Sequence, residues 1–64
     1  MYTTYITYKG IVYTATYSVG DGMVKVRTAL YGEASTQISN TPVEWLARNL
    51  LQSLITDADS KGRL

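Results

Sequence analysis

The first half of the chain alternates apolar or aromatic residues with small polar ones, a period of two that is typical of β-strands. Stretches of this kind lie at residues 2–8, 11–19 and 23–31, separated by Lys9-Gly10 and Gly20-Asp21-Gly22. Asp-Gly favours a two-residue type I′ hairpin, because both central residues of that turn need a positive φ. Lys-Gly is a weaker signal, since lysine disfavours positive φ. The pattern predicts an antiparallel meander centred on residues 11–19.

Two-residue loops at both turns define a register that the side chains can test. The first loop pairs Tyr8 with Ile11, and the second pairs Val19 with Val24. One face then receives Tyr2, Ile6, Tyr8, Ile11, Tyr13, Ala15, Tyr17, Val19, Val24, Val26 and Leu30, with Tyr13 opposite Leu30. The other face receives Thr3, Tyr5, Thr7, Val12, Thr14, Thr16, Ser18, Lys25, Arg27, Ala29 and Tyr31. Because a slip of one residue turns every side chain to the other face, the agreement of two independent turns favours this register.

Residues 34–39 leave two interpretations open. They form either a short fourth strand beside residues 24–31, with Ile38 pointing to the core, or a loop that leads to a helix.

The period changes to 3.6 after Thr41, which indicates a helix. Thr41 is the predicted N-cap, with Pro42 at the first helical position and Glu44 three residues after the cap. An apolar stripe follows at Val43, Leu46, Ala47, Leu50, Leu51 and Leu54. We expect the helix to end near Thr56, before a polar, frayed tail at 57–64. The predicted fold is α+β: one domain over residues 1–56, a three- or four-stranded antiparallel meander with one C-terminal helix packed on one face.

The amino-acid composition argues against several kinds of function but does not identify one. The chain has 64 residues, a net charge of +1, and neither cysteine nor histidine. So short a chain has a small core and usually needs a staple or a partner, and disulfides and the usual zinc ligands are missing. No histidine or cysteine serves as base or nucleophile, so we expect no enzyme and no cofactor. Residues 57–62 resemble half of an EF-hand loop, but Lys61 occupies a ligand position and no closing Glu follows, so we expect no metal.

The sequence shows neither a signal-peptide pattern nor an apolar stretch long enough for a membrane span. We therefore expect a cytoplasmic protein with no membrane partner and no small-molecule substrate.

The face that the helix leaves bare is the first candidate surface. It presents Tyr5, Lys25, Arg27 and Tyr31 among threonines, which suits phosphate contacts and base stacking. A three-stranded sheet followed by one helix resembles the architecture of AP2-type and phage-integrase arm-binding domains, and the resemblance implies reading of the DNA major groove with the bare face. The alternatives are contact with a protein and a merely solvated face.

The edge of the first strand is the second candidate surface. Residues 1–8 carry no charged side chain and no proline, the features that usually protect an edge strand. An unprotected edge favours pairing with a second copy or with a partner strand. Alternatively, residues 34–39 or the tail cover it.

Trp45 is the third candidate, because it falls on the polar side of the helix beside Arg48, a composition typical of interface hot spots. Alternatively, Trp45 folds back over residues 32–40 and closes the core. Together these surfaces favour a non-enzymatic protein that acts by protein–protein contact, as a homodimer, and is a regulator or inhibitor of the kind that viruses and mobile elements encode. The alternative is a DNA-binding domain that uses the bare face.

Overall fold

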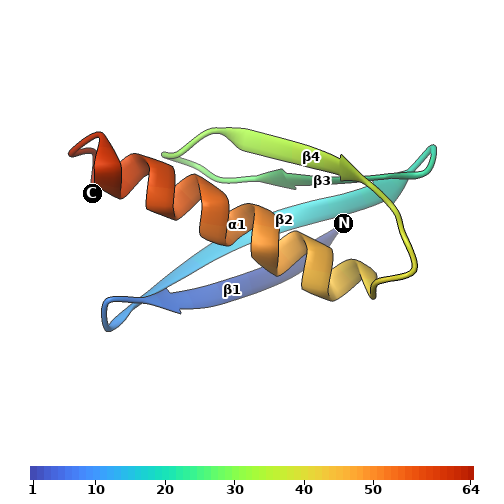
Figure 1. The fold of residues 1–64 in the computed structure, drawn as a ribbon, viewed down its shortest axis with the longest axis horizontal. Coiled ribbons are helices and arrows are strands. Elements are labelled where there is room, and N and C mark those ends of the chain that lie inside the picture. The colour runs from blue at the N-terminus through green and yellow to red at the C-terminus, as the bar shows by residue number, and fades with distance from the viewer.

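The computed structural model describes residues 1–64 and contains four strands and one helix. The strands are β1 (Tyr2–Tyr8), β2 (Ile11–Gly20), β3 (Met23–Arg27) and β4 (Glu33–Gln37), and the helix is α1 (Val43–Ser60). They form one antiparallel sheet in the order β1-β2-β3-β4, with α1 across one face (Figure 1). The predicted α+β meander is confirmed, and the segment left open as strand or loop is a fourth strand.

Both predicted turns and their registers are confirmed. Tyr8 lies opposite Ile11, and Val19 lies opposite Val24. Asp21 has a φ of 52° and Lys9 a φ of 51°, each followed by a glycine with positive φ, as a type I′ turn requires. Lysine adopts this conformation at a cost of about 1 kcal/mol, so the first turn depends on its surroundings more than the second.

The core lies between the sheet and α1. Ala15, Val24 and Val26 pack against Ala47, Leu51 and Ile55, and Leu51 and Ile55 are fully buried. The helix covers only the middle of the sheet, so several side chains of the predicted apolar face remain exposed: Tyr2, Ile11, Val19 and Leu30.

β3 is shorter than predicted, because a turn at Thr28 takes the chain out of the sheet. The Thr28 hydroxyl donates to the Gly32 carbonyl (2.7 Å) and accepts from the Tyr31 N–H (2.8 Å), and the Thr28 N–H donates to the same carbonyl (2.9 Å). The predicted pair of Tyr13 with Leu30 therefore does not form, and the Leu30 side chain is 74% exposed. The prediction that Ile38 points to the core is also wrong, since Ile38 is exposed beyond the end of β4.

The helix starts one residue later than predicted. Pro42 is the N-cap, with ψ of 139°, and its carbonyl accepts the first helical bond from the Leu46 N–H (3.1 Å). No side chain caps this end, so the predicted capping box at Thr41 and Glu44 does not form. The extended ψ of Pro42 keeps it outside the helix, and proline has no side-chain acceptor with which to replace Thr41.

The helix also ends later than predicted, at Ser60 instead of near Thr56. Residues 57–60 are helical and Ala58 is buried, so the expected boundary between domain and frayed tail falls inside α1. Gly62, with φ of 68°, donates to the Asp59 carbonyl (3.0 Å), and the Arg63 N–H donates to the Ala58 carbonyl (2.8 Å). This pair of bonds is a Schellman motif, which closes the helix firmly. No helix has the length and apolar character needed to cross a membrane.

Candidate functional site

β1 is an outer strand of the sheet and its free edge carries unpaired backbone groups. Tyr8 and Ile11 flank a two-residue turn and so form a hydrogen-bonded pair, which directs the even-numbered peptide groups of β1 toward β2. The N–H and C=O groups of Thr3, Tyr5 and Thr7 point away from the sheet. None of the backbone hydrogen bonds outside the regular elements involves these three residues. No backbone group therefore closes this edge anywhere along the strand.

The side chains along this edge do little to block it. Thr3, Tyr5 and Thr7 are exposed on the bare side, and no residue of the strand is charged or proline. At the start of the strand, Met1 and Tyr2 are exposed as well. An edge of this length and composition is a template for pairing with another strand.

One side chain from the helix does reach the edge. The Arg48 Nε donates to the Tyr5 carbonyl oxygen at 3.4 Å, and the guanidinium carbon lies 5.3 Å from the centre of the Tyr5 ring. Arg48 forms no ion pair with an acidic residue. The structure thus brings together two of the predicted site residues, Tyr5 and Arg48, at the middle of the open edge.

Trp45 is 55% exposed, so the alternative in which its ring closes the core is wrong. It lies three residues before Arg48 on α1, on the side of the helix that faces solvent. Its part in binding stays a prediction.

The bare face holds Lys25 and Arg27, but its positive charge is partly cancelled. Arg27 lies directly opposite Glu33 on β4, and its Nε donates to the Glu33 carboxylate at 3.1 Å. Lys25 lies between Ser18 and Ser35 and has no acidic partner. The net charge from these cations and Glu33 is small, and phosphate binding depends mainly on net positive charge.

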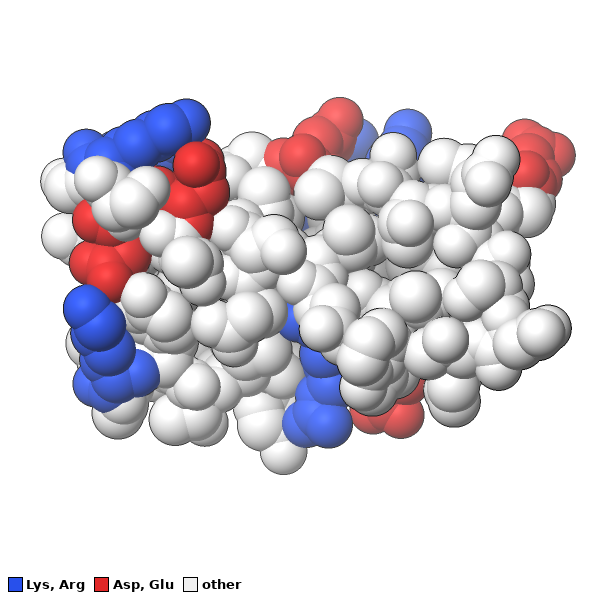
Figure 2. All heavy atoms as spheres, viewed as in Figure 1, with Lys and Arg blue, Asp and Glu red and all other residues white.

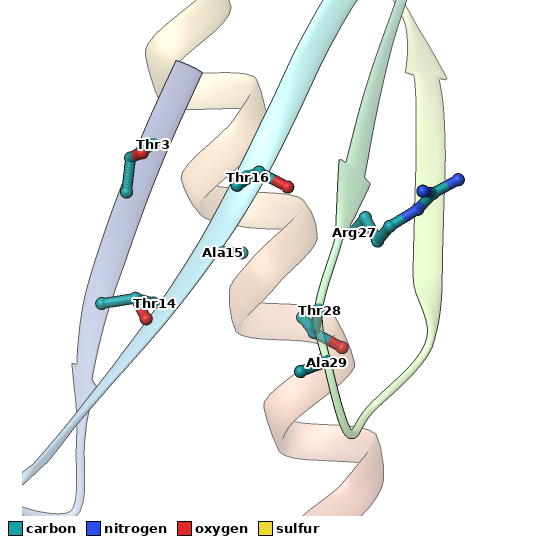
Figure 3. Close-up of a pocket in the computed structure, with 7 residues that line it drawn as sticks. All are labelled: Thr3, Thr14, Ala15, Thr16, Arg27, Thr28 and Ala29. Carbon is teal, nitrogen blue, oxygen red and sulfur yellow. The ribbon is translucent and has the colours of Figure 1, made fainter. Parts of the chain in front are cut away.

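A shallow concavity of about 360 Å³ opens on the bare face where β3 diverges from β2 (Figure 3). Four of its seven lining residues are threonines, and the Arg27 side chain extends away from the other lining residues (Figure 3). Its lining residues are Thr3, Thr14, Ala15, Thr16, Arg27, Thr28 and Ala29. It contains no carboxylate and no paired acid and base that could catalyse a reaction.

The prediction that Tyr31 lies on the bare face is wrong. Its ring packs edge-on against Tyr13, with centroids 6.0 Å apart and planes at 77°, and it contacts the core that α1 covers. The turn at Thr28 ends the alternation of faces before it reaches Tyr31, which is why the strand pattern misplaces it.

A cluster that the sequence did not reveal joins the β1–β2 turn to the C-terminal end of α1. The Asp59 carboxylate accepts from the Tyr8 hydroxyl and from the Lys9 ammonium, each at 2.7 Å and to the same oxygen. The Lys9 bond, with a further contribution from Tyr8, holds the pKa of Asp59 below its usual value. The same bonds raise the pKa of Lys9 and of Tyr8. The carboxylate therefore fastens the β1–β2 turn to the end of α1.

Charged side chains gather around this cluster. Figure 2 shows them at the left end, over the end of α1 and the β1–β2 turn, while the middle of this side is largely uncharged. Lys61 and Asp57 add an ion pair there at 3.0 Å. Lys9, Asp59, Lys61 and Asp57 are all in ion pairs, so these contacts hold the end of α1 against the β1–β2 turn. The structure contains no group of acidic residues with metal-ligand geometry.

Comparison of the chain with models of known families, with curated proteins and with solved structures finds no match.

Proposed function

We propose that this protein is a small, non-enzymatic interaction module that binds another protein chain by adding a strand along β1. The observation that supports this most directly is the open edge of β1, where no backbone group pairs with the outward peptide groups of Thr3, Tyr5 and Thr7, and where the strand has no charge or proline. In strand addition the backbone bonds supply affinity and the flanking side chains supply specificity. Tyr5 and Trp45 are exposed side chains placed to select a partner, whereas Arg48 lies against the Tyr5 carbonyl and is displaced when the strand is added.

A module of this kind suits a regulator or inhibitor, of the type that viruses and mobile elements encode, because it needs a surface and no chemistry. Its partner set would begin with a second copy of the chain, and the absence of cysteine fits work in the cytoplasm.

DNA binding by the bare face is the second candidate, and it rests on Lys25, whose charge is unpaired. It is weaker, because Glu33 neutralises Arg27 and Tyr31 is absent from that face. Binding to duplex DNA that is undetectable at low salt would remove it.

Proline substitutions on the two edges test the main proposal. Thr3→Pro removes an outward N–H from β1 without removing a bond to β2, and it obstructs an incoming strand. Ser35→Pro makes the same change on β4, where Ser35 also points outward, and is the matched control. We expect wild type and Ser35→Pro to retain the same bound proteins from a lysate of the source organism, and to self-associate equally in light scattering.

Thr3→Pro should lose both forms of association while keeping the circular dichroism of the fold. Equal binding by all three proteins would contradict the proposal.

A further inference from the structure

The residues of β1 are arranged almost symmetrically about Tyr5. The strand reads Y-T-T-Y-I-T-Y, and reversing it changes only the positions of Thr4 and Ile6. Antiparallel pairing of two identical strands about a two-fold axis places each residue opposite its mirror position. A sequence that is nearly its own reverse therefore presents matching side chains to a second copy.

Hydrogen bonding points to the same axis. The outward groups belong to Thr3, Tyr5 and Thr7, and an axis at Tyr5 pairs Tyr5 with Tyr5, and Thr3 with Thr7, of the second copy. Each such pair exchanges two backbone bonds, so every outward group of the strand finds a partner. An axis one residue away, at Thr4 or at Ile6, would place Thr7 opposite Met1 or Thr3 opposite Lys9 of the second copy, which lie outside β1, and axes further away leave more outward residues without a partner in the strand.

We propose that β1 binds a second copy of this chain, forming a symmetric dimer with Tyr5 on the two-fold axis and one continuous sheet across both copies. This rests on the proposed function and names the partner at that same edge.

The side chains agree with this arrangement on both faces of the sheet. On the bare face, threonine would meet threonine and the exposed Tyr5 rings would meet each other, and both kinds of cross-strand pair are favourable. On the helix side, Thr4 would lie opposite Ile6 and Tyr2 opposite Tyr8. Since β1 has no charged residue, no like-charged pair arises along the contact.

Arg48 must move when the second copy binds. Its Nε occupies the Tyr5 carbonyl, which in the dimer accepts from the Tyr5 N–H of the second copy. The present contact is long at 3.4 Å and exposed, so a backbone bond can replace it.

Engineered disulfides test the register, because the natural chain has no cysteine. With the axis at Tyr5, Thr3 lies opposite Thr7 of the second copy, within the Cα separation that a disulfide spans. Two Thr3 residues would lie about 13 Å apart along the strands, which is too far. The variants are Thr3→Cys, Thr7→Cys and, as a control on the opposite edge, Ser35→Cys.

We expect mild oxidation of an equimolar mixture of Thr3→Cys and Thr7→Cys to give the mixed disulfide dimer at least tenfold faster than Ser35→Cys alone gives its dimer. Thr3→Cys alone and Thr7→Cys alone should form dimers no faster than the control. Homodimers of either variant that form as fast as the mixed dimer would overturn the register.

The same mixture also separates this proposal from the proposed function. If the mixture forms no mixed dimer faster than the control while Thr3→Pro still loses its partners from the lysate, the second copy is the wrong partner and strand addition at β1 stands. If Thr3→Pro loses nothing and the mixture also fails, both proposals fail.

Discussion

β1 and β4 are the two edges of one sheet, and they are protected very differently. β4 has five residues, E-A-S-T-Q, and carries Glu33, whereas β1 has seven residues and no charge. Short length and charge are usual ways to prevent edge pairing. β4 has both of these features in its own sequence. β1 has neither, and the only side chain that bonds to its edge is Arg48 of the helix. The contrast supports the proposal that a partner binds at β1.

Both edges belong to a sheet that packs on α1, so a cavity in the core between them should lower the free energy of unfolding more than the other substitutions do. Leu51 is fully buried between α1 and the sheet, so Leu51→Ala leaves a cavity in a small core. We expect a loss of about 3 kcal/mol in the free energy of unfolding, measured by urea denaturation. Gln52→Ala, on the exposed side of the helix, should change it by less than about 0.5 kcal/mol. Equal effects of the two variants would mean that α1 is not packed on the sheet as described.

Asp59 of α1 forms an ion pair with Lys9, next to the end of β1, whereas β4 has no ion pair with α1. Because the folded pKa of Asp59 lies below its ordinary value of 3.8, its contribution to stability is present above that value. The contribution is lost as the pH falls through the folded pKa. We therefore expect wild type to lose stability from pH 5 to acid more steeply than Asp59→Asn.

Amide hydrogen exchange should show which part of the chain the Asp59 bonds stabilise. At neutral pH, Asp59→Asn should speed exchange in the β1–β2 turn and leave β4 unchanged. Parallel stability curves for the two proteins at acid pH, with unchanged exchange in the turn, would show that the cluster contributes nothing.

Arg48 partly blocks the β1 edge, so its removal should make β1 pair with another strand more readily while β4 stays unchanged. Arg48→Ala frees the Tyr5 carbonyl and removes a cation from the proposed axis. The dimer displaces this arginine in both copies, so an exposed contact of about 0.5 kcal/mol in each makes self-association of the variant about fivefold tighter. Sedimentation equilibrium measures the change, and Gln52→Ala again serves as the control. Weaker association of Arg48→Ala would mean that the arginine belongs to the interface instead of covering it.

Glu33→Gln should have the smallest effect, since the ion pair with Arg27 is exposed on the bare face beside β4. We expect a change in unfolding free energy below about 1 kcal/mol and unchanged self-association. The variant removes the negative charge beside Arg27, so DNA binding by the bare face should be easiest to detect in this variant. Salt-sensitive binding of wild type to duplex DNA that becomes tighter in Glu33→Gln would shift the account to the bare face.

The sequence predicts the pairing of β1, β2 and β3 well, because turn residues and side-chain alternation are independent signals that agree. Asp21-Gly22 specifies a turn type, and every residue from Tyr2 to Val26 then has a defined face. The first departure comes at Thr28, whose hydroxyl closes a local turn with Gly32 and Tyr31. Threonine and tyrosine both favour strands, so composition conceals that turn.

The candidate site was predictable in part for the same reason. The absence of charge in β1 can be read from the sequence, but the sequence left open whether residues 34–39 or the tail cover its edge, and the structure places β4 beside β3 instead. The contact of Arg48 with Tyr5 and the Asp59 cluster depend on where α1 crosses the sheet. These contacts join residues 43 and more positions apart, and no local pattern specifies them.

The most direct test of the central claim is the mass of the chain in solution, by light scattering after gel filtration across a range of concentrations. The account predicts a rise from the 7.1 kDa of one chain toward twice that mass by high micromolar concentration, in wild type and in Ser35→Pro but not in Thr3→Pro. A mass that stays at one chain in all three proteins would contradict pairing of β1 with a second copy.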